Sequence, residues 1–150
     1  MAYTLSSRSL DKLEGVNEDL VKVVKRAIEL TKIDFGVIYG MRTQEEQQKL
    51  FDAGKSQTMK SKHLNGDAVD LMAYVDGKAS WELNLYDDLA DAMKWAATEE
   101  GVVVRWGAAW HIDDISTWDG TMEEAMMAYI DLRRSQGRRP FIDGPHFELN

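Results

Sequence analysis

Apolar residues recur every three or four positions in three long segments, and this spacing predicts three amphipathic helices. The first covers residues 18–31 and follows Asn17, a residue type that often caps a helix N-terminus. The second has its apolar positions within residues 85–96 and is closed by Gly101. The third covers residues 122–134 and opens on a capping box.

Four shorter segments are rich in β-branched and aromatic residues, and we predict that each is a strand. They lie at residues 35–42, 68–74, 102–106 and 146–149. The pair Asp76-Gly77, after the second segment, is typical of a tight turn. A capping box at residues 43–46 predicts a short helix that ends before Gly54, and the polar residues 56–61 predict a loop.

The order of these elements indicates the fold class. Strands and helices alternate irregularly, and the turn signals permit antiparallel pairing between strands. This pattern predicts an α+β fold, with a small antiparallel sheet packed with about three helices, rather than a doubly wound parallel sheet. The length of 150 residues is about that of one domain, so we expect a single domain over residues 1–150.

Composition excludes several classes of function. The chain has no cysteine, which excludes disulfides, thiolate zinc fingers, iron–sulfur sites and cysteine nucleophiles, so a metal would need histidine and carboxylate ligands. The net charge of −8 argues against a nucleic-acid partner bound through its phosphates. Apolar runs are too short for membrane insertion, and the first fifteen residues lack the apolar segment of a signal peptide. We expect a protein made in the cytoplasm.

Of the three histidines, His63 has the most informative neighbours. Asn65-Gly66 predicts a tight hairpin that would pair His63 with Ala68. Asp70 would then lie diagonally opposite His63, with Cβ atoms roughly 7–8 Å apart, a gap that an imidazole and a carboxylate can bridge at one ion. In the same hairpin, Ser61 would face Asp70 and donate a hydrogen bond to it.

Two imidazoles and one carboxylate form a zinc ligand set of hydrolytic enzymes, with the fourth position left for water. His63 and Asp70 would supply two of these ligands. The residues alone leave the third ligand open between His111 and His146.

Four short motifs resemble those of the peptidase M15 family of zinc peptidases, and they occur in the family's order. Residues 61–70 resemble its SxHxxGxAxD signature, and residues 143–146 resemble its [DE]xxH element. Residues 105–110 resemble its WGxxW segment, and residues 39–43 resemble its upstream arginine motif. Within the family, the chain resembles the phage endolysins that cut the L-alanyl-D-glutamate bond, although residues 111–142 carry an apparent inserted helix.

The resemblance implies a role for each matched residue. His63, Asp70 and His146 would ligate one Zn²⁺ per chain, on the sheet of a hedgehog-like D,D-peptidase fold. Asp143 would take a proton from the attacking water and pass it to the leaving amine. Arg42 would stabilise the oxyanion together with zinc.

Other residues surround this set. Glu148 lies two residues after the last ligand, on the same strand face, and would orient that imidazole or else rival Asp143 as the general base. Ser61 is left open between a substrate contact and a turn cap, and Trp110 between the core and the substrate groove. His111 falls in a polar segment outside the matched motifs, so we expect it at the surface or the rim of the site.

The resemblance implies an endolysin that hydrolyses the L-alanyl-D-glutamate amide bond of the peptidoglycan stem and lyses the bacterial host. Two alternatives remain: a D,D-carboxypeptidase or D-alanyl-D-alanine dipeptidase with the same zinc site, and a metal-free wall-binding module. The enzyme would act as a monomer. It would leave the cytoplasm of the infected host and reach peptidoglycan in the periplasm after another protein had permeabilised the membrane.

Four arginines stand out in this acidic chain. They are Arg133, Arg134, Arg138 and Arg139. Cations at a helix C-terminus complement the helix dipole, which explains such a cluster in structural terms. A second interpretation is contact with anionic polymers of the cell envelope.

Overall fold

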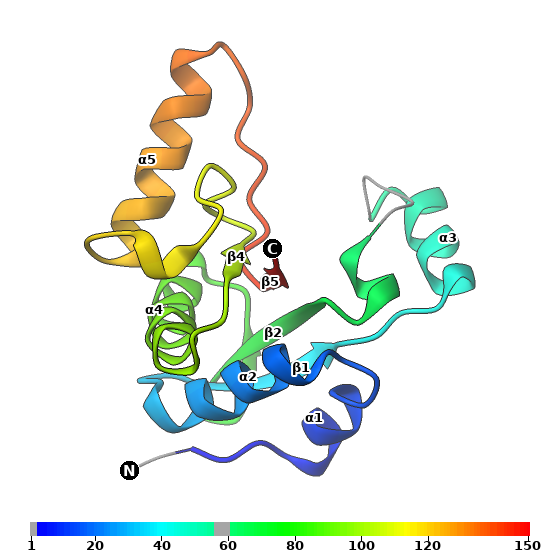
Figure 1. Cartoon of the computed structure of the whole chain (residues 1–150). Helices are drawn as coiled ribbons and strands as arrows, with labels where there is room; N and C mark the ends of the chain where they lie inside the picture. The colour runs from blue at the N-terminus through cyan, green and yellow to red at the C-terminus, as the bar shows by residue number, and fades with distance from the viewer. Residues whose placement is uncertain (1–2, 56–60) are drawn as a thin grey trace.

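The computed structural model, drawn in Figure 1, describes residues 3–55 and 61–150. Its α-helices are α1 (Ser7–Lys12), α2 (Glu18–Leu30), α3 (Gln44–Asp52), α4 (Leu83–Glu100) and α5 (Met122–Ser135). Its strands are β1 (Asp34–Tyr39), β2 (Ala68–Val75), β3 (Lys78–Ser80), β4 (Val104–Trp106) and β5 (His146–Leu149). Two short 3₁₀ helices, η1 (Lys62–Asn65) and η2 (Ile115–Thr117), join them.

The strands form one antiparallel sheet in the order β1-β2-β5-β4, and β3 pairs with β2 as a hairpin. The last strand of the chain therefore lies between two earlier ones. Its pairing with β2 places Asp70 directly opposite His146, and Ala68 opposite Glu148. Side chains alternate between the two faces of a strand. Phe147, which lies between His146 and Glu148 in β5, therefore points to the opposite face and into the hydrophobic core.

The core lies between the sheet and the helices α2 and α4, which pack against each other. Both helices bury the apolar stripe that their spacing predicts, including Leu20 and Leu89, each fully buried. Trp106 is also fully buried and stacks on Phe147, with ring centroids 6.3 Å apart. The core thus packs against one face of β2 and β5, and the opposite face of these two strands carries Asp70, His146 and Glu148.

The α+β class and the antiparallel sheet are confirmed, and α2, α4 and α5 end within two residues of the predicted bounds. The prediction of about three helices was too low, because the described residues contain five α-helices. The short helix predicted after residues 43–46 is α3. The six-residue α1 is too short for apolar residues to establish a period. Apart from Ser61, the predicted loop at residues 56–61 lies outside the described residues.

The hairpin predicted at Asn65-Gly66 was wrong. Residues 62–65 form η1 instead, and Gly66 closes it in a left-handed conformation with φ of 74°. Asn-Gly pairs suit such a helical C-cap as well as a two-residue hairpin, so the local signal was ambiguous. A Cβ atom at Gly66 would lie 2.4 Å from the carbonyl oxygen of Gly15, so packing against the chain before α2 also requires glycine here.

None of the helices in the described part of the chain is both long and apolar enough to cross a bilayer.

Candidate functional site

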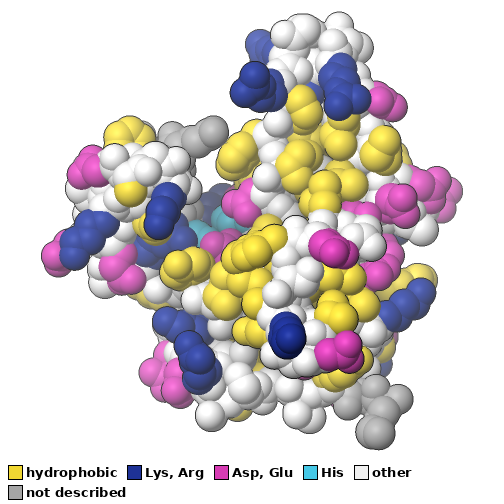
Figure 2. All heavy atoms as spheres, turned by 180° about the vertical axis from the view of Figure 1, so that it is seen from behind, with side chains coloured by type: hydrophobic (Ala, Val, Ile, Leu, Met, Phe, Trp, Pro, Cys, Tyr) yellow, Lys and Arg dark blue, Asp and Glu magenta, His cyan; other side chains and the backbone are white. Residues whose placement is uncertain are grey.

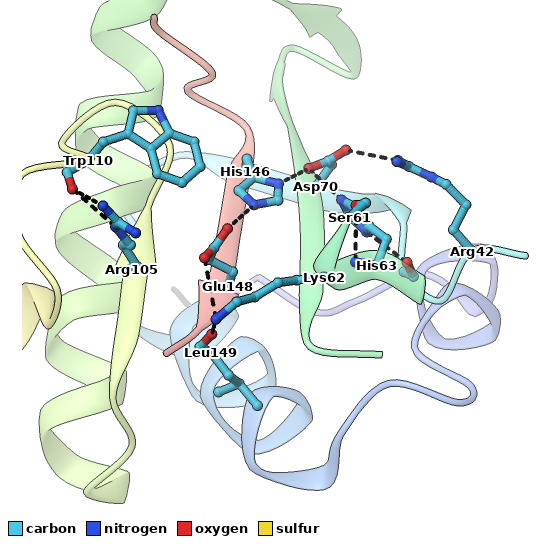
Figure 3. Close-up of polar contacts among 11 residues, drawn as sticks. Arg42, Ser61, Lys62, His63, Asp70, Arg105, Trp110, His146, Glu148 and Leu149 are labelled. Atoms are coloured by element: carbon cyan, nitrogen blue, oxygen red, sulfur yellow. Dashed lines mark hydrogen bonds and ion pairs between the residues drawn. The ribbon is translucent and has the colours of Figure 1, made fainter. Parts of the chain in front are cut away.

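Three elements bring His63, Asp70 and His146 together at one point above the sheet. His63 comes from η1, Asp70 from β2 and His146 from β5, and one ligand atom of each lies within 4.8 Å of the others. Asp70 Oδ1 is 3.3 Å from His63 Nε2 and 3.1 Å from His146 Nδ1. Figure 3 shows both rings turned toward this carboxylate. His63 and Asp70 therefore lie close enough to share one ion, as predicted, but a 3₁₀ helix and not a hairpin brings them together.

The backbone at the end of β1 sets the orientation of the His63 ring. His63 Nδ1 lies 2.8 Å from the carbonyl oxygen of Gly40, so a proton on Nδ1 is donated there and Nε2 faces Asp70. The backbone N–H of Arg42 donates to the carbonyl of His63 at 2.9 Å. A Cβ at position 40 would lie 1.9 Å from the carbonyl oxygen of Lys12. Glycine at position 40 is thus required by the close approach of the last residue of α1.

Glu148 sets the orientation of the second ring. Its Oε1 lies 2.8 Å from His146 Nε2, the nitrogen that faces away from Asp70. Lys62 Nζ lies 3.5 Å from the other oxygen of this carboxylate. Burial raises the pKa of Glu148. The hydrogen bond with His146 and the charges of His146 and Lys62 lower this pKa by a larger amount, so the net shift is downward.

Asp70 and His146 have strongly shifted pKa values in opposite directions. Burial alone would raise the pKa of Asp70, but hydrogen bonds from His146 and His63 outweigh it and hold that pKa well below its usual range. Burial lowers the pKa of His146, but its bonds to Asp70 and Glu148 raise it to about 9. The point where the three groups meet therefore favours positive charge, and a cation would take the place of the protons.

Arg42 approaches the same carboxylate from the opposite side. Its Nη2 lies 3.8 Å from Asp70 Oδ2, and the residue is only 8% exposed, so its guanidinium is held at the site and not in solvent. Nη1 donates to Gln47 Oε1 at 2.7 Å, and the guanidinium carbon lies 5.4 Å from the centre of the Tyr39 ring. Gln47, on α3, is fully buried. Sequence reasoning missed it, because a glutamine in a polar helix carries no signal of burial.

The residues before β5 are held by the segment after β4. The backbone N–H of Asp143 donates to the carbonyl of Gly107, and that of Gly107 donates to the carbonyl of His146, both at 2.8 Å. The indole N–H of Trp106 donates to the carbonyl of Gly144 at 2.7 Å. A Cβ at Gly107 would lie 2.3 Å from the carbonyl oxygen of Asp143. The Trp-Gly pair thus positions the loop that carries Asp143.

Asp143 lines the same cavity as the three clustered residues. Burial raises its pKa, and the nearby negative charge of Asp70 raises it further, against the smaller opposing effects of the histidines and Arg42. A carboxylate whose pKa is raised is a stronger base, and because its pKa lies closer to neutral pH it can both accept and return a proton during one reaction cycle. Glu148 has the opposite shift and is already bonded to His146.

The cavity above the cluster has a volume of about 520 Å³. Ser61 and Trp110 both line it. Ser61 Oγ accepts a hydrogen bond from the backbone N–H of His63 at 3.2 Å, which caps η1, in place of the predicted bond to Asp70. The Trp110 ring lies 5.6 Å from that of His146, so it belongs to the wall of the cavity.

His111 lies apart from this cluster. Its side chain is exposed, as expected, and its ring packs against those of Tyr129 and Trp118 at 5.7 and 6.1 Å. Within the described residues, one group of three His, Asp or Glu side chains could share a metal ion, and this group is His63, Asp70 and His146.

Comparison with known proteins shows which family the chain resembles in sequence and structure. The sequence model of a family described as phage L-alanyl-D-glutamate peptidase matches residues 1–150. The L-alanyl-D-glutamate peptidase of Escherichia phage T5 is 34% identical in an alignment of 131 residues, and the match covers 80% of this chain and 96% of that protein. The crystal structure of the Serratia marcescens L-Ala D-Glu endopeptidase ChiX matches with a TM-score of 0.72 and 34% identity, over 96% of this chain and 87% of that one.

Proposed function

The chain belongs to the phage L-alanyl-D-glutamate peptidase family, and from this membership we propose that it hydrolyses the amide bond between L-alanine and D-glutamate in peptidoglycan stems. It would act as an endolysin, releasing phage by weakening the wall of the host. The observation that carries the proposal is the cluster of His63, Asp70 and His146 at the floor of an open cavity.

The cluster fits one zinc ion per chain. Two neutral imidazoles and one carboxylate are a catalytic zinc ligand set, and an open fourth position suits the cavity above them. The outward nitrogen of each ring already has an acceptor, Gly40 O for His63 and Glu148 for His146, which is how proteins orient zinc-binding histidines. Bound there, zinc would supply a Lewis acid that polarises the scissile carbonyl and acidifies water.

The surrounding residues divide the remaining chemistry. Asp143 would accept a proton from the attacking water and return it to the departing amine, because its pKa is raised and it lines the cavity. The Arg42 guanidinium would stabilise the negative charge that develops on the carbonyl oxygen. Glu148 would hold His146 in place rather than act as the base, since its carboxylate is already engaged. Trp110 and Ser61 would contact the stem peptide.

We further propose that the enzyme is a monomer with one catalytic domain. The proposed metal ligands, Asp143 and Arg42 line one cavity without a residue from a second chain being needed, and one hydrophobic cluster joins the sheet to its helices. Since its substrate lies outside the inner membrane, an enzyme made in the host cytoplasm would depend on a separate protein that permeabilises the membrane.

Digestion of purified sacculi, with mass spectrometry of the products, tests the proposal. We expect new L-alanine C-termini and D-glutamate N-termini, together with one zinc per chain. His146→Ala should lose both the products and the metal, while His111→Ala, a histidine outside the cluster, should keep them. Release of D-alanine alone would favour a D,D-peptidase, and binding to sacculi without any cleavage would favour a wall-binding module.

A further inference from the structure

Four arginines lie at the outer end of α5 and in the turn that follows it. We call this group, Arg133, Arg134, Arg138 and Arg139, the arginine tip. The whole chain has a net charge of −8, so the tip is a local reversal of sign. Figure 2 shows Lys and Arg side chains gathered at the top of the lobe formed by α5, and the hollow in which the histidines are visible lies at the base of this lobe.

The tip projects from the body of the protein on a defined turn. The buried residues of α5 all lie between Met122 and Tyr129, and the partly buried Ile130 also packs against the core, whereas Arg133 and Arg134 lie further out on the helix. The Arg133 side chain donates to the carbonyl of Arg139 at 3.1 Å, and the N–H of Arg138 donates to the carbonyl of Arg133 at 2.8 Å. These bonds fix the turn on which the other guanidinium groups are presented to solvent.

The positive charges of the tip are not neutralised within the protein. Across residues 3–55 and 61–150, none of the four side chains forms an ion pair with a carboxylate. The helix dipole accounts for Arg133 and Arg134, which lie in the last turn of α5. It does not account for Arg138 and Arg139, which follow the helix. The tip therefore has charge available for a partner outside the chain.

The tip begins at the edge of the catalytic cavity. Phe141 lines that cavity and stacks on Trp110, with ring centroids 6.2 Å apart. Arg139 is two residues earlier, and two residues of chain span at most about 7 Å. The backbone N–H of Phe141 is bonded to the hydroxyl of Tyr129 on α5, which ties this connection to the helix. A polymer whose peptide entered the cavity would thus pass close to the arginines.

We propose that the arginine tip is a second contact for the peptidoglycan polymer, binding carboxylates of stems that neighbour the one in the cavity. A glutamate residue within a peptide keeps one free carboxyl group, so a polymer that repeats such stems is polyanionic. Guanidinium groups match carboxylates in geometry and charge. This inference rests on the proposed function, because it takes peptidoglycan to be the substrate.

An anionic bilayer is the weaker candidate for this partner. Binding to a lipid surface combines basic residues with apolar side chains that insert beside them. Of the exposed large apolar residues nearby, Phe141 is stacked against Trp110 at the cavity and Met127 is six residues before Arg133, which leaves Leu132 directly beside the arginines. One such side chain provides little area for insertion, so charge complementarity with the polymer is favoured.

The test compares two double variants that remove the same charge. Arg134→Ser with Arg138→Ser changes the tip and leaves the Arg133 hydrogen bond intact. Lys22→Ser with Lys25→Ser removes two exposed cations from α2 and serves as the control. Each protein is assayed for cleavage of purified sacculi and of a short soluble stem peptide, and for co-sedimentation with sacculi and with phosphatidylglycerol vesicles.

At low ionic strength, the tip variant should cleave sacculi about 3- to 10-fold more slowly than the wild type and co-sediment with them less. Its cleavage of the soluble peptide should be unchanged, and the difference on sacculi should vanish near 1 M salt, where charges are screened within about 3 Å. The control should match the wild type.

Equal losses on both substrates, no loss on sacculi, or co-sedimentation with vesicles but not sacculi would overturn the inference. Co-sedimentation with sacculi does not require catalysis. A wild type that cleaved neither substrate would therefore refute the proposed function, while the sedimentation of the tip variant would still decide the role of the tip.

Discussion

Asp70 on β2 and Asp87 on α4 are both poorly solvated, but their pKa values are shifted in opposite directions. Burial acts on both in the same direction, since removing a carboxylate from water raises its pKa. Asp70 faces two histidines and Arg42, and its pKa falls well below the usual range. Asp87 is surrounded by the carboxylates of Glu123, Asp88 and Asp91, and burial together with these charges raises its pKa to about 7.

The hydrogen bonds of the two side chains show the same contrast. Asp70 Oδ1 contacts both histidine rings. No donor in the described part of the chain lies within hydrogen-bonding distance of Asp87 Oδ1, although the residue is only 5% exposed. Neighbours rather than burial therefore decide whether a buried aspartate is a stable anion. Only the arrangement around Asp70 is suited to a bound cation.

The largest effect is expected for Asp70→Asn, which keeps the shape of the side chain and removes its charge. Without the carboxylate, the two imidazoles lose the anion that attracts a divalent ion. We expect metal binding to be lost and sacculus cleavage to fall by about 10³-fold or more. Elemental analysis and rate measurements on the same preparation check this. A variant that retained one metal per chain and a rate within tenfold of the wild type would contradict the ligand assignment.

Glu148→Gln should have a smaller effect on the same centre. The amide can still contact His146, but it no longer carries the charge that stabilises an oriented, electron-rich imidazole. Changes of this kind cost about 10- to 100-fold in metal affinity or activity. Competition with a zinc chelator would measure the affinity. If Glu148 were instead the general base, the rate would collapse while the metal affinity stayed at the wild-type value.

Gln47→Leu should act through Arg42 with a yet smaller effect. Leucine fills a similar volume but cannot accept the bond from Nη1, so the guanidinium loses one of its constraints. We expect kcat on a stem peptide to fall about tenfold, with KM and metal content nearly unchanged, because the oxyanion contact forms mainly in the transition state. Gln48→Leu, at an exposed position on the same helix, is the control. Equal losses in both variants would indicate damage to α3 instead.

Much of the fold was predictable because its signals are local. Thr43 and Thr121 each form the predicted capping box, and Gly101 closes α4 in a left-handed conformation. Strand alternation also placed His146 and Glu148 on one face, where the structure finds them bonded. Such features depend on residues a few positions apart, so a single sequence contains the information they need.

Several of the missed features depend on contacts between distant segments. The Asn65-Gly66 pair fits two kinds of turn, and packing of Gly66 against Gly15 accompanies the one found. Gly40 presents its carbonyl to His63 only because β1 ends beside η1. The environment of Asp87 combines neighbours on its own helix with Glu123 on α5. The sequence shows these residues, but their proximity follows from the tertiary fold.

The smallest predicted effect, Asp87→Asn, tests the other half of the comparison. Asp87 has a pKa of about 7 in the folded chain, against an ordinary value of 3.8, so the folded state binds its proton more tightly than the unfolded state does. Its contribution to stability is therefore complete below about pH 4 and is lost as pH rises through about 7. Above that pH, the folded chain holds a buried anion near three other carboxylates.

Asparagine carries no charge at any of these pH values, so the variant should escape this loss. We expect Asp87→Asn to be more stable than the wild type by about 1 kcal/mol at pH 8, with the difference shrinking toward pH 4. Denaturant unfolding at several pH values would measure it. Asp88→Asn, at a partly exposed neighbouring position, should show a smaller dependence on pH. A variant equally destabilised at every pH would mean that the Asp87 carboxyl is satisfied in the folded chain, and that the contrast with Asp70 lies in packing rather than in charge.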